Sequence, residues 1–409
     1  MLFTLGEGKS GALGLGNRYM DCNVPTRLTV GAEQREEEEE EEQQQQQQQE
    51  NGEYACIAAG WSHSACIRDG KPWVWGRTHD FKNVLRIQRK FRLSCWAMRV
   101  HNSVDCIVPT PVHFEDDVEH VACGCCTTTF VDSSGRLWGM GDNALGQLGL
   151  GSTSVRVWDP ELVMGLDGER VVASALGYAH GLALSRSGSV YSWGKGERGQ
   201  TGIGGSRSES SAMPLPFFNP QRTAVSVPFS DMKGGQRKRR GSSRSGKVSA
   251  EVDRAAAPRA TAIFCGLNHS AAMTSSHELY VWGKFMSATA GEDEYVPRLL
   301  AQNVAFAGCG QFHVSYMTQD GELYVMGVAP SGFGLYRKDR VMAEALLVEK
   351  GFNVGAVQQL ICGADGCTYI LYKDGALSGH RWTGELDIAQ ELQGFKDIAF
   401  GFKHACLLG

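Results

Sequence analysis

The stretch VVASALGYAHGLALSRSGSVYSWGKGERGQTGIG, residues 171–204, decides the fold of this chain, because it is the clearest copy of a unit that recurs along it. Leu182 and Leu184 alternate with small residues, which predicts a half-buried strand. Gly188 predicts a turn, and the alternating run 189–194 predicts the second strand of a hairpin. The segment that follows is too rich in glycine for the interior of a helix or strand, so it predicts a loop.

An anchor of the form Gly-x-x-His, or a degraded form of it, begins this unit seven times. The anchor pairs are Gly60/His63, Gly124/Thr127, Gly177/His180, Gly266/His269, Gly310/His313, Gly363/Gly366 and Gly401/His404. A strand ending in Trp-Gly, or in a relic of it, is expected after six anchors, at Trp75-Gly76, Trp138-Gly139, Trp193-Gly194, Trp282-Gly283, Met326-Gly327 and Ser378-Gly379. The glycine loop is absent after Gly76 and weak after Gly283, Gly327 and Gly379.

The seventh unit is divided between the two ends of the sequence. The chain ends at Gly409, soon after His404, with no Trp-Gly strand, whereas residues 1–6 have the pattern of that strand and Gly6 to Gly16 the pattern of its loop. Pairing the last strand with the first would leave no free sheet edge. We therefore predict an all-β fold, a seven-bladed β-propeller closed by pairing of its N- and C-terminal strands.

A single propeller domain over residues 1–409 is expected to carry three insertions. Residues 33–53 hold ten acidic residues, one arginine and a glutamine run, which predicts disorder. Residues 77–108 and 206–260 are basic, and either insertion could bind an acidic partner, nucleic acid or chromatin, or could be a plain solvated segment. Their candidate binding residues are Arg86, Lys90, Arg92, Arg237, Lys238, Arg239 and Arg240, the last four also forming a candidate nuclear-localisation signal.

Composition sets further limits on the function. The net charge of -5 indicates neither a nucleic-acid nor a membrane protein as a whole, and no apolar run is long enough to span a bilayer. Residues 1–8 lack the pattern of a signal peptide, and thirteen cysteines are best explained as free thiols in a reducing compartment, so we expect an intracellular protein, cytoplasmic, nuclear or both. His120, Cys123, Cys125 and Cys126 are close enough in the sequence to suggest a zinc site, but neighbouring strand residues point to opposite faces, which favours core packing.

Five anchors retain histidine, and equivalent positions of a propeller lie on one ring around its axis. We therefore predict a partner-binding axial ring formed by His63, His180, His269, His313 and His404. The alternative is a structural role, in which each histidine bonds to backbone within its own blade.

These motifs resemble the repeat named for the regulator of chromosome condensation. The segments most similar to it are Gly139 to Gly151 (GMGDNALGQLGLG), Gly194 to Gly204, Asp320 to Gly327 (DGELYVMG) and Gly6 to Gly16. In the family member that exchanges nucleotide on the Ran GTPase, some axial histidines contact the GTPase. The resemblance implies that His180, His269 and His404 are the matching positions, while Thr127 and Gly366 depart from the pattern.

No nucleophile elbow or convincing metal-ligand spacing is present, so no covalent chemistry, cofactor or metal is expected. The predicted function is a monomeric, non-enzymatic interaction or regulatory propeller with a protein partner. The alternative is a guanine-nucleotide exchange factor for a Ran-like small GTPase, associated with chromatin. A resemblance to the plant UV-B receptor of the same family is poor, because only Trp61 occupies the place of that receptor's Gly-Trp-x-His tryptophans.

Overall fold

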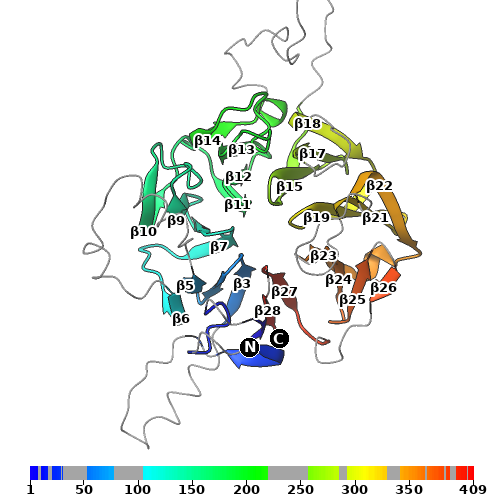
Figure 1. The fold of residues 1–409 in the computed structure, drawn as a ribbon, viewed down its shortest axis with the longest axis horizontal. Coiled ribbons are helices and arrows are strands. Elements are labelled where there is room, and N and C mark those ends of the chain that lie inside the picture. Colours follow the sequence, from blue (N-terminus) through cyan, green and yellow to red (C-terminus); the bar gives the residue numbers. More distant parts are fainter. Residues whose placement is uncertain are drawn as a thin grey trace, which may run out of the picture.

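The computed structural model forms a ring of seven four-stranded antiparallel sheets, the blades, around a central axis (Figure 1). The predicted seven-bladed β-propeller is therefore confirmed. The structure describes residues 1–7, 11–16, 21–28, 30, 53–77, 105–219, 257–284, 293–328, 341–363, 366–381, 384–386, 393–402 and 404–409. Within these ranges the helical segments are two single 3-10 turns, η2 (Pro216–Phe218) and η5 (Val354–Ala356).

The blades are numbered from β3 onward, and each contains four strands. Blade 1 contains β3 (Tyr54–Ala59), β4 (His63–Arg68), β5 (Lys71–Arg77) and β6 (Asp105–Pro111). Blade 2 contains β7 (Val118–Cys123), β8 (Thr127–Asp132), β9 (Leu137–Asn143) and β10 (Ser154–Leu162). Blade 3 contains β11 (Val171–Leu176), β12 (His180–Ser185), β13 (Val190–Gly194) and β14 (Glu209–Pro214). Blade 4 contains β15 (Ala260–Cys265), β16 (His269–Thr274), β17 (Leu279–Gly283) and β18 (Glu294–Ala301).

The remaining blades complete the ring. Blade 5 contains β19 (Val304–Cys309), β20 (His313–Thr318), β21 (Glu322–Val328) and β22 (Val341–Lys350). Blade 6 contains β23 (Val357–Cys362), β24 (Thr368–Tyr372), β25 (Leu377–Arg381) and β26 (Gly384–Leu386). Blade 7 contains β27 (Asp397–Phe400), β28 (His404–Leu408), β1 (Leu2–Gly6) and β2 (Cys22–Leu28).

Blade 7 closes the ring with two strands from each end of the chain. Its strand order is β2-β1-β28-β27, and the two ends lie side by side in Figure 1. Leu2 pairs with Leu408, and Gly6 pairs with His404. The predicted closure by N- and C-terminal strands is confirmed, and it removes the free edges that an open ring would present to other chains.

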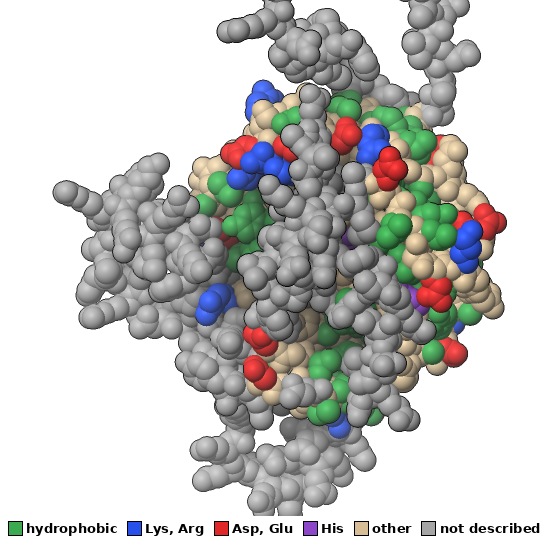
Figure 2. Space-filling view, turned by 45° about the vertical axis from the view of Figure 1, so that its right-hand side comes forward, with side chains coloured by type: hydrophobic (Ala, Val, Ile, Leu, Met, Phe, Trp, Pro, Cys, Tyr) green, Lys and Arg blue, Asp and Glu red, His purple; other side chains and the backbone are tan. Residues whose placement is uncertain are grey.

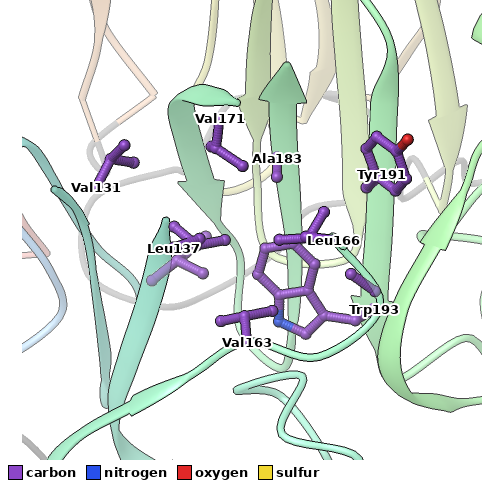
Figure 3. Close-up of a cluster of buried hydrophobic side chains, with 10 residues drawn as sticks. Val131, Leu137, Val163, Leu166, Val171, Ala183, Tyr191 and Trp193 are labelled. Atoms are coloured by element: carbon purple, nitrogen blue, oxygen red, sulfur yellow. The ribbon is translucent and has the colours of Figure 1, made fainter. Parts of the chain in front are cut away.

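The hydrophobic core is divided into clusters that lie between neighbouring blades. Between blades 2 and 3, Leu137, Val163 and Leu166 surround the indole of Trp193 (Figure 3). The second strand of a blade faces a neighbour on both sides, which is why every residue of β12 is buried. Stability therefore depends mainly on contacts of each blade with the next.

Three buried tryptophans join their blades to the glycine loop of the preceding blade. In blade 4, Trp282 Nε1 donates a hydrogen bond to the Gln200 carbonyl of blade 3 at 2.9 Å. A Cβ added to Gly202 of that loop would lie 2.7 Å from Trp282 Nε1, so the loop needs glycine there. Equivalent bonds join Trp75 to the Ala12 carbonyl at 2.8 Å and Trp193 to the Gln147 carbonyl at 2.9 Å.

The hydrogen bond between tryptophan and loop explains why the tryptophan of a blade and the glycine loop of the preceding blade are lost together. Each blade that follows an intact glycine loop has tryptophan at the end of its third strand. Each blade that follows a lost or weak loop has another residue there, namely Met140, Met326, His380 and Leu5. Without the loop carbonyl and its glycine, a buried indole N–H would lack an acceptor, which is unfavourable by about 1–3 kcal/mol.

The register of blade 2 corrects one predicted relic of the motif. Thr127 pairs with Gly141, just as His180 pairs with Gly194 in blade 3. Met140-Gly141 therefore takes the Trp-Gly place, and the predicted Trp138-Gly139 was two residues too early. Trp138 has a different role, because its Nε1 donates to Asp132 Oδ2 at 2.8 Å within the blade.

The register of blade 6 also differs from the predicted one. The Gly363 amide donates to the Cys367 carbonyl, so Cys367, not the predicted Gly366, takes the histidine place after one inserted residue. Thr368 pairs with His380, so His380-Arg381 replaces the predicted Ser378-Gly379. Residue spacing alone could not reveal the insertion, because glycine recurs by chance in a chain this rich in it.

His380 provides a polar contact between blades 5 and 6 where other blades use tryptophan. Its Nε2 lies 2.8 Å from Ser378 Oγ, and its ring meets Phe352 edge to face at 5.1 Å. Its Nδ1 lies 2.9 Å from Glu349 Oε2 of blade 5, an ion-pair distance at which the atoms are not aligned for a hydrogen bond.

The insertions are shorter than predicted where the structure describes their flanks. Within 77–108, Arg77 ends β5 and residues 105–108 belong to β6. Within 206–260, β14 and η2 belong to blade 3, and Ala260 begins β15. Of the acidic insertion 33–53, only Glu53 lies inside the described residues. The remainder of all three insertions lies outside them.

Replacing Trp193 by phenylalanine is expected to destabilise the chain more than replacing Trp282. The Gln200 carbonyl accepts hydrogen bonds from both Trp282 Nε1 and Ser270 Oγ, the second at 2.9 Å. In Trp282→Phe the carbonyl would therefore keep the hydrogen bond from Ser270. In blade 3 the place of Ser270 is taken by Gly181, which has no hydroxyl. We expect losses of about 2–3 kcal/mol for Trp193→Phe and about 1–2 kcal/mol for Trp282→Phe in denaturant titrations. Equal losses would contradict the role of the shared carbonyl.

Candidate partner-binding site

The five predicted histidines lie in the interior rather than on the surface. Each begins the second strand of its blade, directly after the anchor turn. Their exposed fractions are 0% for His63, 1% for His180, His269 and His313, and 5% for His404. Partner contact through these five side chains stays a prediction, and the surface above them consists of other residues of the same turns.

Three of the imidazoles bond across the blade interfaces, not within their own blades as the structural alternative supposed. His180 Nε2 of blade 3 lies 2.9 Å from Ser270 Oγ of blade 4. The same contact joins His63 Nε2 to Thr128 Oγ1 at 3.0 Å and His404 Nε2 to Ser64 Oγ at 2.8 Å. The histidines therefore help to hold consecutive blades together.

These hydrogen bonds decide which nitrogen of the neutral imidazole carries the proton. The single Ser270 hydroxyl proton is donated to the Gln200 carbonyl, so the hydroxyl oxygen must accept from a protonated His180 Nε2. Burial lowers the pKa of His180 and His404 to about 4, and burial lowers the pKa of His63 and His269 to about 3. The rings are neutral at physiological pH, as a structural role requires.

The anchor glycine is required because the imidazole lies against it. A Cβ on Gly177 would lie 2.2 Å from His180 Cε1 and 2.6 Å from the Gly266 carbonyl of the next blade. Equivalent collisions with the paired histidine occur at Gly60, Gly266, Gly310 and Gly401. Glycine and histidine thus form one structural device, which explains their fixed spacing in the sequence.

The anchor turns surround a small cavity at the mouth of the central axis. Its volume is about 110 Å³, and the residues that follow the anchor glycines line it, including Trp61, Cys125, Tyr178, Gln311 and Phe402. Ligand pockets usually measure about 300–1,000 Å³, so this cavity fits a few waters or one inserted side chain rather than a cofactor.

Three aromatic residues of these turns form what we call the axial aromatic cluster: Trp61, Tyr178 and Phe402. Trp61 stacks on Phe402 with ring centroids 5.2 Å apart and contacts Tyr178 at 5.5 Å. Blade 2 lies between the blades of Trp61 and Tyr178, and its small Cys125 leaves room for their contact. Phe402 is 41% exposed, and the other two rings are partly exposed.

The cluster was not predicted from the sequence, although its residues share a visible position. Each directly follows an anchor glycine, at the place where the comparison with the UV-B receptor singled out Trp61 alone. Strand alternation predicts which residues are buried within a blade. It does not predict which turn residues of blades 7, 1 and 3 make contact across the axis.

Cysteines line the axis beneath the cluster. Cys123, Cys265, Cys309 and Cys362 each precede an anchor glycine. Burial raises the pKa of the Cys265 thiol to about 12 and raises that of Cys123 and Cys309 well above the ordinary value, which keeps these groups protonated. Among the described residues, no group of three or more His, Cys, Asp or Glu side chains is arranged to hold a metal ion.

The basic residues predicted in the insertions, Arg86, Lys90, Arg92, Arg237, Lys238, Arg239 and Arg240, lie outside the described residues. On the face seen in Figure 2, charged side chains of both signs are interspersed with hydrophobic groups. Elsewhere among the described residues, oppositely charged side chains form ion pairs, such as Lys350 with Glu322 at 2.6 Å. No helix in the described ranges is long and apolar enough to cross a membrane.

Comparison with known proteins agrees with this geometry. The family model "Regulator of chromosome condensation (RCC1) repeat" matches residues 134–184 and 187–237, and a second model of the same repeat matches residues 171–200. The chain therefore carries regulator of chromosome condensation repeats at these residues. The predicted resemblance is thereby confirmed, and the matched residues fall in and after blades 2 and 3, where the repeat is best preserved.

Similar members of the family and similar structures extend this result. Protein RCC2 of Homo sapiens is 32% identical over 231 residues, which is 45% of this chain and 44% of that protein, so the match spans less than half of the relative's length. Human WBSCR16 has the same fold, with a TM-score of 0.66 and 19% identity over 99% of this chain and 98% of that one. Prp20p from Saccharomyces cerevisiae also has this fold, with a TM-score of 0.65 and 15% identity over 99% of this chain and 90% of that one.

Proposed function

We propose that this chain is a non-enzymatic interaction propeller that regulates a protein partner, and that the partner docks on the axial aromatic cluster. The observation that carries this proposal is the cluster of partly exposed aromatic rings, Trp61, Phe402 and Tyr178, at the rim of a small cavity. Tryptophan and tyrosine are enriched at binding hot spots because they bury a large rigid surface at low entropic cost. The cavity below could receive one side chain of the partner.

The partner is expected to present an apolar or cationic side chain to this cluster. Aromatic faces attract both, the first by burial of apolar surface and the second by cation–π attraction. None of the described residues that line the cavity is charged, so their contribution to affinity would come from shape and burial.

Alanine at Trp61 is expected to reduce recovery of the partner about tenfold or more, as loss of a hot spot would. The measurement is quantitative affinity purification from cells with the tagged full chain and with Trp61→Ala. Trp158→Ala is the matched control, because Trp158 lies on the outer strand β10 and is 48% exposed. Retained partners in Trp61→Ala, or equal losses in both variants, would contradict docking at the axial mouth.

The basic insertions are a second proposed contact, to an acidic protein surface, nucleic acid or chromatin. Their contribution can be tested by deleting residues 220–256, a deletion that leaves η2, β14 and β15 intact. Deleting the whole of 206–260 would remove the outer strand of blade 3 and confuse unfolding with lost binding. Unchanged partners and unchanged DNA binding after the shorter deletion would eliminate a contact through the second insertion, 206–260.

Exchange of guanine nucleotide on a Ran-like small GTPase is the alternative function. Its support is that Prp20p, a propeller of the same fold, binds Gsp1p and histones. An exchange factor needs no catalytic side-chain set, since it acts by binding the nucleotide-free GTPase more tightly than the loaded form. Nucleotide release from loaded small GTPases would be measured in an excess of this protein, and no acceleration would eliminate the alternative.

A further inference from the structure

The anchor turn of blade 2 holds two adjacent cysteines, Cys125 and Cys126. Their Sγ atoms lie 3.6 Å apart, and each side chain is 7% exposed. The sequence favoured sulfurs on opposite faces of a strand. The structure differs because both residues lie in the bend between β7 and β8, where successive side chains can turn toward each other.

No other anchor has this pair. The corresponding residues are Trp61-Ser62, Tyr178-Ala179, Leu267-Asn268, Gln311-Phe312, Ala364-Asp365 and Phe402-Lys403. Cys125 also lines the axial cavity, so a small reagent entering the mouth would reach it. The other axial cysteines each have an anchor glycine, not a second thiol, as the next residue.

We propose that Cys125 and Cys126 form a redox modification site, a dithiol that peroxide converts to a disulfide between neighbouring residues. The Cys125 thiol releases its proton and its sulfur attacks one peroxide oxygen, which breaks the O–O bond and yields sulfenic acid, while the departing hydroxide takes up a proton and leaves as water. The Cys126 sulfur then displaces the hydroxyl of the sulfenic acid as a second water. Overall, two thiols and one hydrogen peroxide give one disulfide and two waters.

The geometry favours this reaction in two ways. The resolving thiol is already 3.6 Å from its target, so no large motion is needed before the second step. The product is also easily reduced, because Cα atoms of adjacent residues are about 3.8 Å apart and disulfides usually require about 4.4–6.8 Å. A strained disulfide has a high reduction potential, which is typical of reversible regulatory bonds.

Oxidation would act on the docking face. The Cys125 amide donates to the Gly177 carbonyl of blade 3 at 3.4 Å, and the Cys126 carbonyl accepts from the Asp142 amide at 3.0 Å. Drawing the sulfurs together must strain this turn, which lies between Trp61 and Tyr178. This consequence rests on the proposed function, whereas the thiol chemistry does not.

The test begins with the full chain, reduced and then titrated with hydrogen peroxide. The remaining thiols are alkylated, the chain is digested, and the mass of the peptide that contains both cysteines is measured by mass spectrometry. We expect this peptide to lose two hydrogens and to escape alkylation at Cys125 and Cys126, and mild dithiothreitol to reverse both changes. Alkylation of both thiols after other cysteines have been oxidised would overturn the proposal.

Variants identify the bond. Cys123→Ser should still form the linked peptide, whereas Cys125→Ser and Cys126→Ser should not. If Cys123→Ser abolishes the link, the disulfide involves Cys123 and the assignment is wrong. The wild-type result alone decides the chemistry if a variant fails to fold. Partner recovery is then compared before and after oxidation, so that failure of the thiol chemistry and failure of docking at Trp61 give different results.

Discussion

The free energy of unfolding is expected to fall by several kcal/mol when the pH is lowered from 7 to 5. Burial lowers the folded-state pKa of His63, His180, His269 and His404 to between about 3 and about 4, below the ordinary value of 6.5. Between those values the unfolded chain binds more protons than the folded chain, so stability rises with pH. Each histidine contributes about 2 kcal/mol to the loss at pH 5, and little further loss is expected from it below pH 3.

Denaturant titrations from pH 8 to pH 4 measure this effect. Stability should be almost constant above pH 7, where both states hold neutral imidazole, and should fall steadily below pH 6.5. A variant His180→Gln, whose side chain does not titrate, should take up about one proton fewer on unfolding near pH 5. The same unfolding free energy at pH 5 and pH 7 would show that the rings are not held neutral in the folded chain.

Alanine at Gly177 is expected to destabilise the chain by more than about 4 kcal/mol, or to prevent folding. The new Cβ would lie 2.2 Å from His180 Cε1, 2.5 Å from His180 Nδ1 and 2.6 Å from the Gly266 carbonyl. The imidazole cannot move without losing its bond to Ser270, and the carbonyl belongs to the backbone of the next blade. Moving either the imidazole or the carbonyl away from the new Cβ would therefore be destabilising.

Two other glycines of the chain provide matched controls. A Cβ on Gly205 would have nothing within 4 Å, and its backbone does not have positive φ, so Gly205→Ala should change stability by less than about 0.5 kcal/mol. Gly168 also has open space but a φ of +77°, so Gly168→Ala should be destabilising by about 1 kcal/mol from backbone strain alone. The stabilities of the three variants are compared by denaturant titration, or by limited proteolysis for a variant that folds poorly. A loss for Gly177→Ala no larger than for Gly168→Ala would contradict the collision.

The interface contacts explain how this repeat has diverged. A blade can lose its tryptophan only where the preceding blade has lost the glycine loop, because the indole and the loop carbonyl satisfy each other. Blade 6 shows the result of such a loss, with His380 bonded to Ser378 and paired with Glu349 where other blades bury an indole. In this chain the tryptophan of a blade and the glycine loop of the preceding blade are therefore present together or absent together.

The sequence by itself determined the propeller, its seven blades and the closure in blade 7, because alternation, turn glycines and the recurring anchor are local patterns that each blade repeats. It placed Trp138-Gly139 and Gly366 wrongly, since strand register depends on pairing between chain segments and not on spacing. Only the tertiary structure decided that the five histidines are buried between blades, and that Trp61, Tyr178 and Phe402 meet at the axis. The physical reason is that these contacts join residues of different blades, and no pattern within one repeat specifies which side chains of another blade will lie opposite.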